Sequence, residues 1–162
     1  MRFWLLTNTT YGTWLPGDER GWVQYHRGSQ LPDPVKKLEA SARMSEDACR
    51  LNDDERRLVE TTIAAHCRSR NWILHVVNCR SNHVHIVVTA VEHPDKVRDE
   101  FKARCTRRLK ELQQQRFAAT SRRSVPVRKR WWAQRGSKRY LNDLDSLEAA
   151  ILYVRDAQDA PR

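Results

Sequence analysis

The chain alternates short β-prone runs with longer stretches whose apolar residues recur at helical spacing. Residues 3–9, 72–78 and 83–89 are rich in aromatic and branched side chains and predict strands. The second and third of these runs are close enough along the chain to form a hairpin. Helical spacing predicts helices over residues 53–70, 94–115 and 146–158, and a further short strand is predicted within 131–142.

Three stretches lack such patterns. Residues 11–21 are rich in Gly and Pro and predict a loop that carries aromatic side chains, and residues 24–45 read as an irregular insertion. Residues 116–130 are basic, contain Pro126 and predict a mobile loop. At 162 residues the chain fits one domain with an insertion at about 10–50.

The basic charge of the protein is concentrated in one segment. The net charge is +10, yet residues 94–140 contain 16 Lys and Arg against 4 Asp and Glu, so the rest of the chain is slightly acidic. A focused basic segment is typical of proteins with a polyanionic partner, most often nucleic acid.

Composition excludes several other classes. No apolar run approaches the ~20 residues that a membrane span needs, and the N-terminal run is too short for a signal peptide, so we expect a cytoplasmic protein that does not enter a membrane. The four cysteines form no CxxC pair, which argues against a zinc ribbon. We expect them to be reduced packing residues.

His83-Val84-His85 is the main candidate for chemistry. In a strand, side chains two positions apart share a face, about 6.6–7 Å from each other. Two imidazoles at that spacing can bind one divalent metal and leave coordination positions open for a substrate oxygen. The alternative is a pair of half-exposed histidines on a sheet face. The core-like residues 86–88 favour the metal, because charged histidines there would be costly unless ligated or hydrogen-bonded.

The stretch SNHVHIVV (81–88) resembles the His-hydrophobic-His motif of HUH endonucleases. The order of predicted elements, with a basic helix after the motif and a tyrosine on a late helix, resembles the single-tyrosine HUH transposases, including the REP-associated tyrosine transposases. The resemblance covers about residues 50–160 and the first strand. It implies an α+β fold in one domain, with a ferredoxin-like antiparallel sheet that carries the His-Val-His strand and helices packed on one face.

The resemblance also implies an activity. The expected reaction is cleavage and rejoining of single-stranded or hairpin DNA through a 5′-phosphotyrosine intermediate, with a divalent metal, Mg²⁺ or Mn²⁺, on His83 and His85. Tyr153 lies in the middle of the last predicted helix and has the family's placement for the nucleophile, with Tyr140 as the reserve candidate. A monomer and a homodimer both stay open.

Two further site residues follow from the resemblance. A third metal ligand often lies one helical turn beyond the tyrosine, but that position here is Ala157, which cannot ligate. A one-residue bulge in the helix would bring Gln158 around, and Asp156 is the second choice. Lys102 matches a lysine that the family pattern places near the scissile phosphate; otherwise it is one more solvated cation.

We expect the basic segment to bind DNA phosphates, and the adjacent tryptophans to stack on unpaired bases, although at least one tryptophan should anchor the core instead. The DNA-binding candidates are Lys96, Arg104, Arg107, Arg108, Arg122, Arg123, Arg128, Lys129, Arg130, Trp131 and Trp132.

Three other functions remain open. A relaxase or replication-initiator nickase shares the histidine motif but is usually longer and places its tyrosine differently. A domesticated binder of DNA or RNA hairpins would keep the fold without cleaving. A metal-dependent hydrolase would use water as its nucleophile, although no Asp and Glu cluster accompanies the histidines in sequence.

Overall fold

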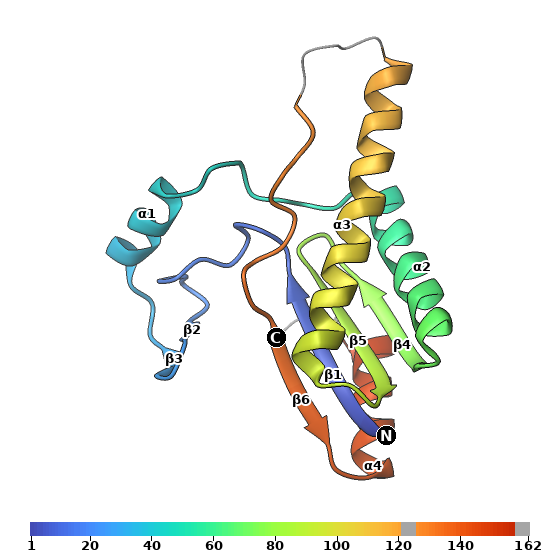
Figure 1. Ribbon diagram of the computed structural model, residues 1–162. Helices are drawn as coiled ribbons and strands as arrows, with labels where there is room; N and C mark the ends of the chain where they lie inside the picture. Colours follow the sequence, from blue (N-terminus) through green and yellow to red (C-terminus); the bar gives the residue numbers. More distant parts are fainter. Residues whose placement is uncertain (121–125, 158–162) are drawn as a thin grey trace.

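The computed structural model describes residues 1–120 and 126–157 of the chain, with the side chain of residue 157 excepted. Four strands form one antiparallel sheet in the order β4-β5-β1-β6. The strands are β1 (Arg2–Thr9), β4 (Ile73–Cys79), β5 (His83–Ala90) and β6 (Ser137–Leu141). Figure 1 shows the long helices α2 (Asp53–Arg70) and α3 (Pro94–Ala119) side by side on the sheet.

The order of these elements along the chain is β1, α2, β4, β5, α3, β6, which is the βαββαβ arrangement of ferredoxin-like folds. The predicted α+β class, with an antiparallel sheet that carries the His-Val-His strand, is therefore confirmed. Each of the predicted strands is present, and β4 and β5 form the expected hairpin.

The sheet has an apolar layer on both faces. Leu6, Val84, Ile86 and Val88 pack with α2 and α3 in the larger core. The opposite face carries a smaller cluster around Val87, which packs against α4 (Leu144–Leu152) and the residues that follow it. The expectation of helices on one face holds for α2 and α3, and the last helix adds a cover on the other face.

The helix ends follow local capping rules. Asn52 is the N-cap of α2: its side chain accepts from the backbone N–H of Glu55, whose carboxylate accepts from the Asn52 N–H. The predicted stripe of α3 is confirmed, since Val97, Phe101 and Cys105 are each at most 1% exposed. All four cysteines are buried free thiols, as expected.

One prediction of irregular structure was wrong, and another placed the start of a loop too early, with residues 121–125 of that loop outside the described residues. The insertion contains a hairpin of β2 (Trp22–Gln24) and β3 (Gly28–Gln30) and a helix, α1 (Pro34–Ala42). α1 begins where Asp33 caps it and Pro34 occupies its first turn. The predicted loop at 116–130 begins later than expected, because α3 continues to Ala119 and Arg116 pairs with Asp54 of α2 at 2.8 Å.

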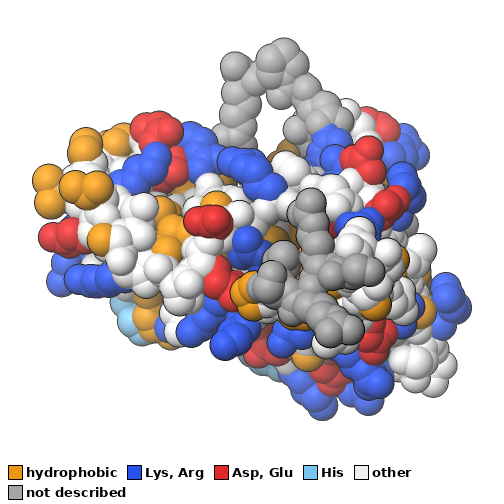
Figure 2. Space-filling view, turned by 90° about the horizontal axis from the view of Figure 1, so that it is seen from above, with side chains coloured by type: hydrophobic (Ala, Val, Ile, Leu, Met, Phe, Trp, Pro, Cys, Tyr) orange, Lys and Arg blue, Asp and Glu red, His pale blue; other side chains and the backbone are white. Residues whose placement is uncertain are grey.

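α1 buries none of its residues, so this helix adds little to the core. Val35 and Leu38 are 66% and 72% exposed. Figure 2 shows hydrophobic side chains gathered at the end of the molecule where the insertion lies, with Lys and Arg spread over much of the remaining surface. Among the described residues, no helix is both long and apolar enough to span a membrane.

Candidate active site

The two histidines of the motif share the sheet face that α4 covers. His85 lies opposite Thr7 of β1 and Asn78 of β4 in the strand register, and His83 lies opposite Thr9. Val84 between them is 1% exposed on the other face, in the larger core. The imidazole centroids of His83 and His85 are 4.7 Å apart, so the strand geometry brings the two rings together.

Each imidazole has a hydrogen-bond partner on Nδ1. The Asn82 Oδ1 lies 2.7 Å from Nδ1 of His83, and the Thr7 hydroxyl lies 2.7 Å from Nδ1 of His85. An amide oxygen only accepts, so Nδ1 of His83 carries the proton and Nε2 keeps a lone pair. His85 takes the same tautomer when its Nδ1–H donates to Thr7. This pattern is typical of imidazoles that bind a metal through Nε2.

Burial keeps both imidazoles neutral. It lowers the pKa of His83, with a smaller contribution from the cationic Arg80, and it lowers the pKa of His85 to about 4, helped by the proximity of His83. Metal binding requires the neutral imidazole. The pair therefore fits a divalent cation in charge state, tautomer and spacing at neutral pH.

Tyr153 lies beside this pair, although it is far from it in sequence. Its ring centroid is 5.7 Å from that of His85, in an edge-to-face arrangement, and the side chain is 40% exposed. The next residue, Val154, is fully buried, and its carbonyl accepts a hydrogen bond of 3.0 Å from the Asn78 side chain. Because Asn78 is the cross-strand neighbour of His85, this bond sets the helix end in register with the histidines.

We expect Asn78→Ala to disturb this register. Loss of the bond should lower the free energy of unfolding by about 0.5–1.5 kcal/mol, which urea denaturation would measure. DNA cleavage should fall by more than the loss of folded protein accounts for, because Tyr153 would no longer be held at His85. A variant that loses stability but cleaves at the wild-type rate per folded molecule would show that Asn78 is only structural.

The reserve tyrosine is separated from the histidines. Tyr140 on β6 packs against the indole of Trp4, with ring centroids 5.2 Å apart, and Trp4 belongs to the core on the α2 and α3 face. The structure therefore brings Tyr153, and not Tyr140, to the His83–His85 pair.

The helix changes its winding at Tyr153. α4 ends at Leu152, and Tyr153–Ala157 form a π-helical turn, which has an extra residue compared with an α-helical turn. An extra residue in the helix is what would bring Gln158 around as the third metal ligand. Gln158 itself lies outside the described residues. The carboxylate of Asp156 pairs with Arg155 at 2.8 Å. Among the described residues, no three His, Cys, Asp or Glu side chains form a metal-binding group.

Lys102 does not join the histidines and Tyr153. It lies on α3, and its amino group donates to the backbone carbonyls of Ala133 at 2.8 Å and Arg135 at 2.7 Å. Burial, together with the nearby Arg98, lowers its pKa to about 8. The structure thus gives Lys102 a role in holding the segment that leads into β6, and its role in catalysis stays a prediction.

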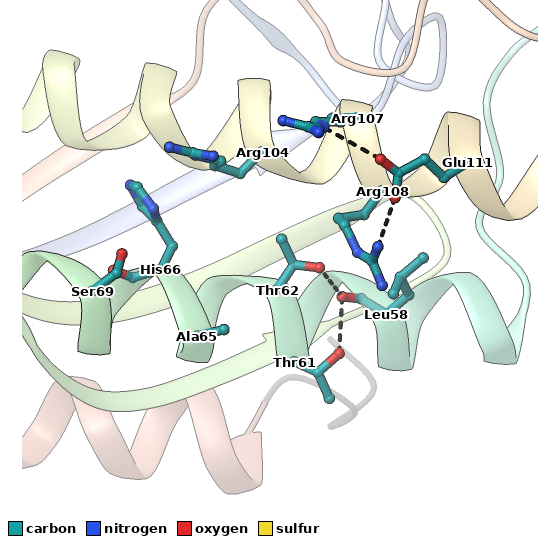
Figure 3. A pocket seen from close by; sticks show the side chains of 10 residues that line it. All are labelled: Leu58, Thr61, Thr62, Ala65, His66, Ser69, Arg104, Arg107, Arg108 and Glu111. Atoms are coloured by element: carbon teal, nitrogen blue, oxygen red, sulfur yellow. Dashed lines mark hydrogen bonds and ion pairs between the residues drawn. The ribbon is translucent and has the colours of Figure 1, made fainter.

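Part of the predicted DNA surface lies in a groove of about 500 Å³ between α2 and α3. Figure 3 shows Arg104, Arg107 and Arg108 of α3 lining this groove opposite Thr61, Thr62 and Ser69 of α2. Glu111 pairs with Arg107 and Arg108 and offsets part of their charge. The groove and the exposed Lys96 belong to the helical layer, on the other side of the sheet from His85.

In the segment before β6, the structure corrects the assignment of Trp131 as a DNA-binding residue. Trp131 is 3% exposed and packs in the larger core, so it is not available to stack on a base. The prediction that at least one of these tryptophans anchors the core is confirmed. Trp132 is half-buried against the same core, with its indole N–H bonded to Thr106.

The neighbouring basic residues are also partly engaged. Glu46 accepts from the backbone N–H groups of Lys129 and Arg130, and the Arg128 side chain donates to the Asp47 carbonyl. Lys129 and Arg130 stay exposed and can still meet phosphates. Arg122 and Arg123 lie outside the described residues.

Sequence reasoning missed the partners of the histidines. Asn82 directly precedes the motif and could have been noticed as a polar neighbour. Thr7 and Asn78 carry no such signal, because only the strand register places them beside His85.

The fold is similar to that of a REP-associated tyrosine transposase solved with a bound REP hairpin, with a TM-score of 0.51 and 12% sequence identity. The match covers 94% of this chain and 64% of the transposase, so the chain spans less than two thirds of that protein's length. At this identity the likeness shows the fold alone. No protein-family model and no curated protein sequence matches the chain.

Proposed function

We propose that this protein is a metal-dependent single-strand DNA endonuclease and strand transferase of the single-tyrosine HUH type. The observation that carries the proposal is the position of Tyr153, whose ring lies 5.7 Å from His85 beside the His83–His85 pair. A phenol beside two neutral imidazoles, with Thr7 and Asn78 next to them on the same sheet face, is the arrangement that metal-assisted attack on a phosphate needs. The similar fold of the transposase supports the same class.

The residues divide into those that would bind the metal and those that hold the binding groups in position. His83 and His85 would hold a divalent cation, Mg²⁺ or Mn²⁺, which when bound stabilises negative charge on a phosphate oxygen. Thr7 and Asn82 orient the two imidazoles, and Asn78 holds the end of the tyrosine helix. Gln158 remains the proposed third ligand.

The covalent step uses the phenol oxygen of Tyr153. That oxygen forms a bond to phosphorus, the bond from phosphorus to the 3′ oxygen breaks, and the phenol proton passes to solvent. The released 3′ oxygen takes up a proton, and the 5′ phosphate stays on the tyrosine. Attack by another 3′-OH reverses the step, so rejoining needs no ATP.

The DNA partner follows from charge. The groove with Arg104, Arg107 and Arg108, together with Lys96, Lys129 and Arg130, can contact the phosphates of a folded strand. The transposase with the similar fold was solved with a REP hairpin, and we propose hairpin DNA with a single-stranded extension as the substrate here.

The decisive experiment incubates the protein with end-labelled single strands that carry a hairpin, with Mg²⁺ or Mn²⁺, and resolves the products on denaturing gels. A nick accompanied by a covalent protein–DNA adduct is the expected result. A shifted but uncut strand would instead identify a non-cleaving hairpin binder. A nick without an adduct would identify a hydrolase that uses water.

A further inference from the structure

One aromatic–arginine pair connects the insertion to the strand that borders the candidate active site. Tyr25 lies in the turn between β2 and β3, and the Arg135 guanidinium carbon is 3.5 Å from the centroid of its ring. Tyr25 is 61% exposed, and Arg135 is also exposed. The His26 ring also packs against Tyr25, with centroids 3.7 Å apart, so the exposed guanidinium of Arg135 is the part of the pair that a ligand reaches first.

The backbone beneath Arg135 is held from α3. Lys102 donates to the Arg135 carbonyl, and Arg98 donates to the Gly136 carbonyl at 3.3 Å. A Cβ on Gly136 would lie 2.3 Å from the Thr7 carbonyl oxygen, so the chain passes directly against β1 at this point. Because these contacts fix the main chain, the side chain of Arg135 starts from a defined position.

That position is close to the catalytic face. Ser137 pairs with Thr7, whose hydroxyl is bonded to His85. Ala133 donates to the Thr9 carbonyl and Ser137 pairs with Thr7, so residues 134–136 bulge from the sheet edge between the rows of His83 and His85. Arg135 lies in this bulge, two residues before the edge strand β6 begins.

The charge of Arg135 is available to an outside anion. Among the described residues, no carboxylate forms a salt bridge with it, and its recorded side-chain partner is the Tyr25 ring. The insertion's Arg20 differs: it lies 4.3 Å from the Trp14 ring centroid, but Asp18 neutralises it at 2.6 Å. Bases stack on both aromatic rings and guanidinium planes, and a free guanidinium also attracts phosphate.

We propose that Tyr25 and Arg135 bind an unpaired nucleotide of the single strand beside the cleavage site, with its base stacked on the guanidinium that the Tyr25 ring supports and a phosphate near the same group. The proposal rests on the proposed function in one respect, since it adds a contact to the same DNA. It gives the β2–β3 turn of the insertion a role in holding the single-stranded part of the substrate.

The test compares binding of a labelled oligodeoxythymidine with binding of a blunt duplex, by fluorescence anisotropy. Tyr25→Ala and Arg135→Ala should each weaken oligodeoxythymidine binding by about 5- to 150-fold, the range that loss of one stacked base produces. Affinity for the duplex, which offers no unpaired base, should stay within about twofold. Arg27→Ala is the matched control, because Arg27 is exposed in the same turn and its removal costs the same charge.

A second measurement locates the base. An abasic site at one position of the oligodeoxythymidine should weaken wild-type binding, and Tyr25→Ala should remove that difference. Equal loss of strand and duplex affinity in Arg135→Ala, unchanged affinity in both variants, or no strand binding by the wild type would overturn the proposal. A wild type that binds through this pair but neither nicks DNA nor forms an adduct would contradict the proposed function and leave this inference intact.

Discussion

Tyr153→Phe is expected to abolish both the covalent protein–DNA adduct and the free 3′-OH product. The substitution removes one oxygen atom and keeps the ring that contacts His85. Since the side chain is 40% exposed and the phenol hydroxyl has no recorded hydrogen bond in the described part of the chain, folding and DNA binding should survive. Denaturing gels with end-labelled strands measure the adduct, and peptide mapping of the wild-type adduct should place the phosphate on the peptide that contains AILYVR.

Tyr140→Phe is the control for this experiment. It makes the same chemical change at an exposed tyrosine that packs on Trp4, away from the histidines. It should cleave and form the adduct as the wild type does. If Tyr140→Phe loses the adduct and Tyr153→Phe keeps it, the two residues exchange roles and the proposed site is wrong. If both variants cleave, a water nucleophile explains the reaction better.

His83→Ala and His85→Ala are each expected to lower the cleavage rate to about one-hundredth of the wild-type rate or less. Loss of a residue that only orients a metal ligand already costs about 10- to 100-fold, so loss of the ligand itself should cost at least the upper end of that range. Binding of hairpin DNA should change little, because the basic residues of α3 lie on the other side of the sheet.

His75→Ala provides the control on the same sheet. His75 is a half-buried histidine of β4, bonded to the Thr89 hydroxyl and packed against Phe3, and it makes no recorded contact with the motif among the described residues. Single-turnover cleavage with Mg²⁺ or Mn²⁺ should stay near the wild-type rate in this variant, with folding checked by circular dichroism. Wild-type rates in both motif variants would show that the metal site is misassigned.

Local sequence determined most of the framework. The apolar stripe of α3 and the alternation of β5 follow from residue spacing, because a helix or a strand must turn its apolar side toward the core. The same alternation fixed that His83 and His85 share a face. Sequence reasoning failed in the insertion, because strands of three residues and an exposed helix leave too few buried positions to create a periodic signal.

The sequence by itself thus determined the two histidines as a pair, the order of the strands and helices around them, and the basic character of α3. Only the tertiary structure decided which tyrosine meets the histidines, which group orients His85, and which tryptophan is buried. The contacts behind the first two join distant segments: Thr7, Asn78 and Tyr153 come from three different elements. Strand register and helix packing bring them together, and neither can be read from the spacing of residues within one segment.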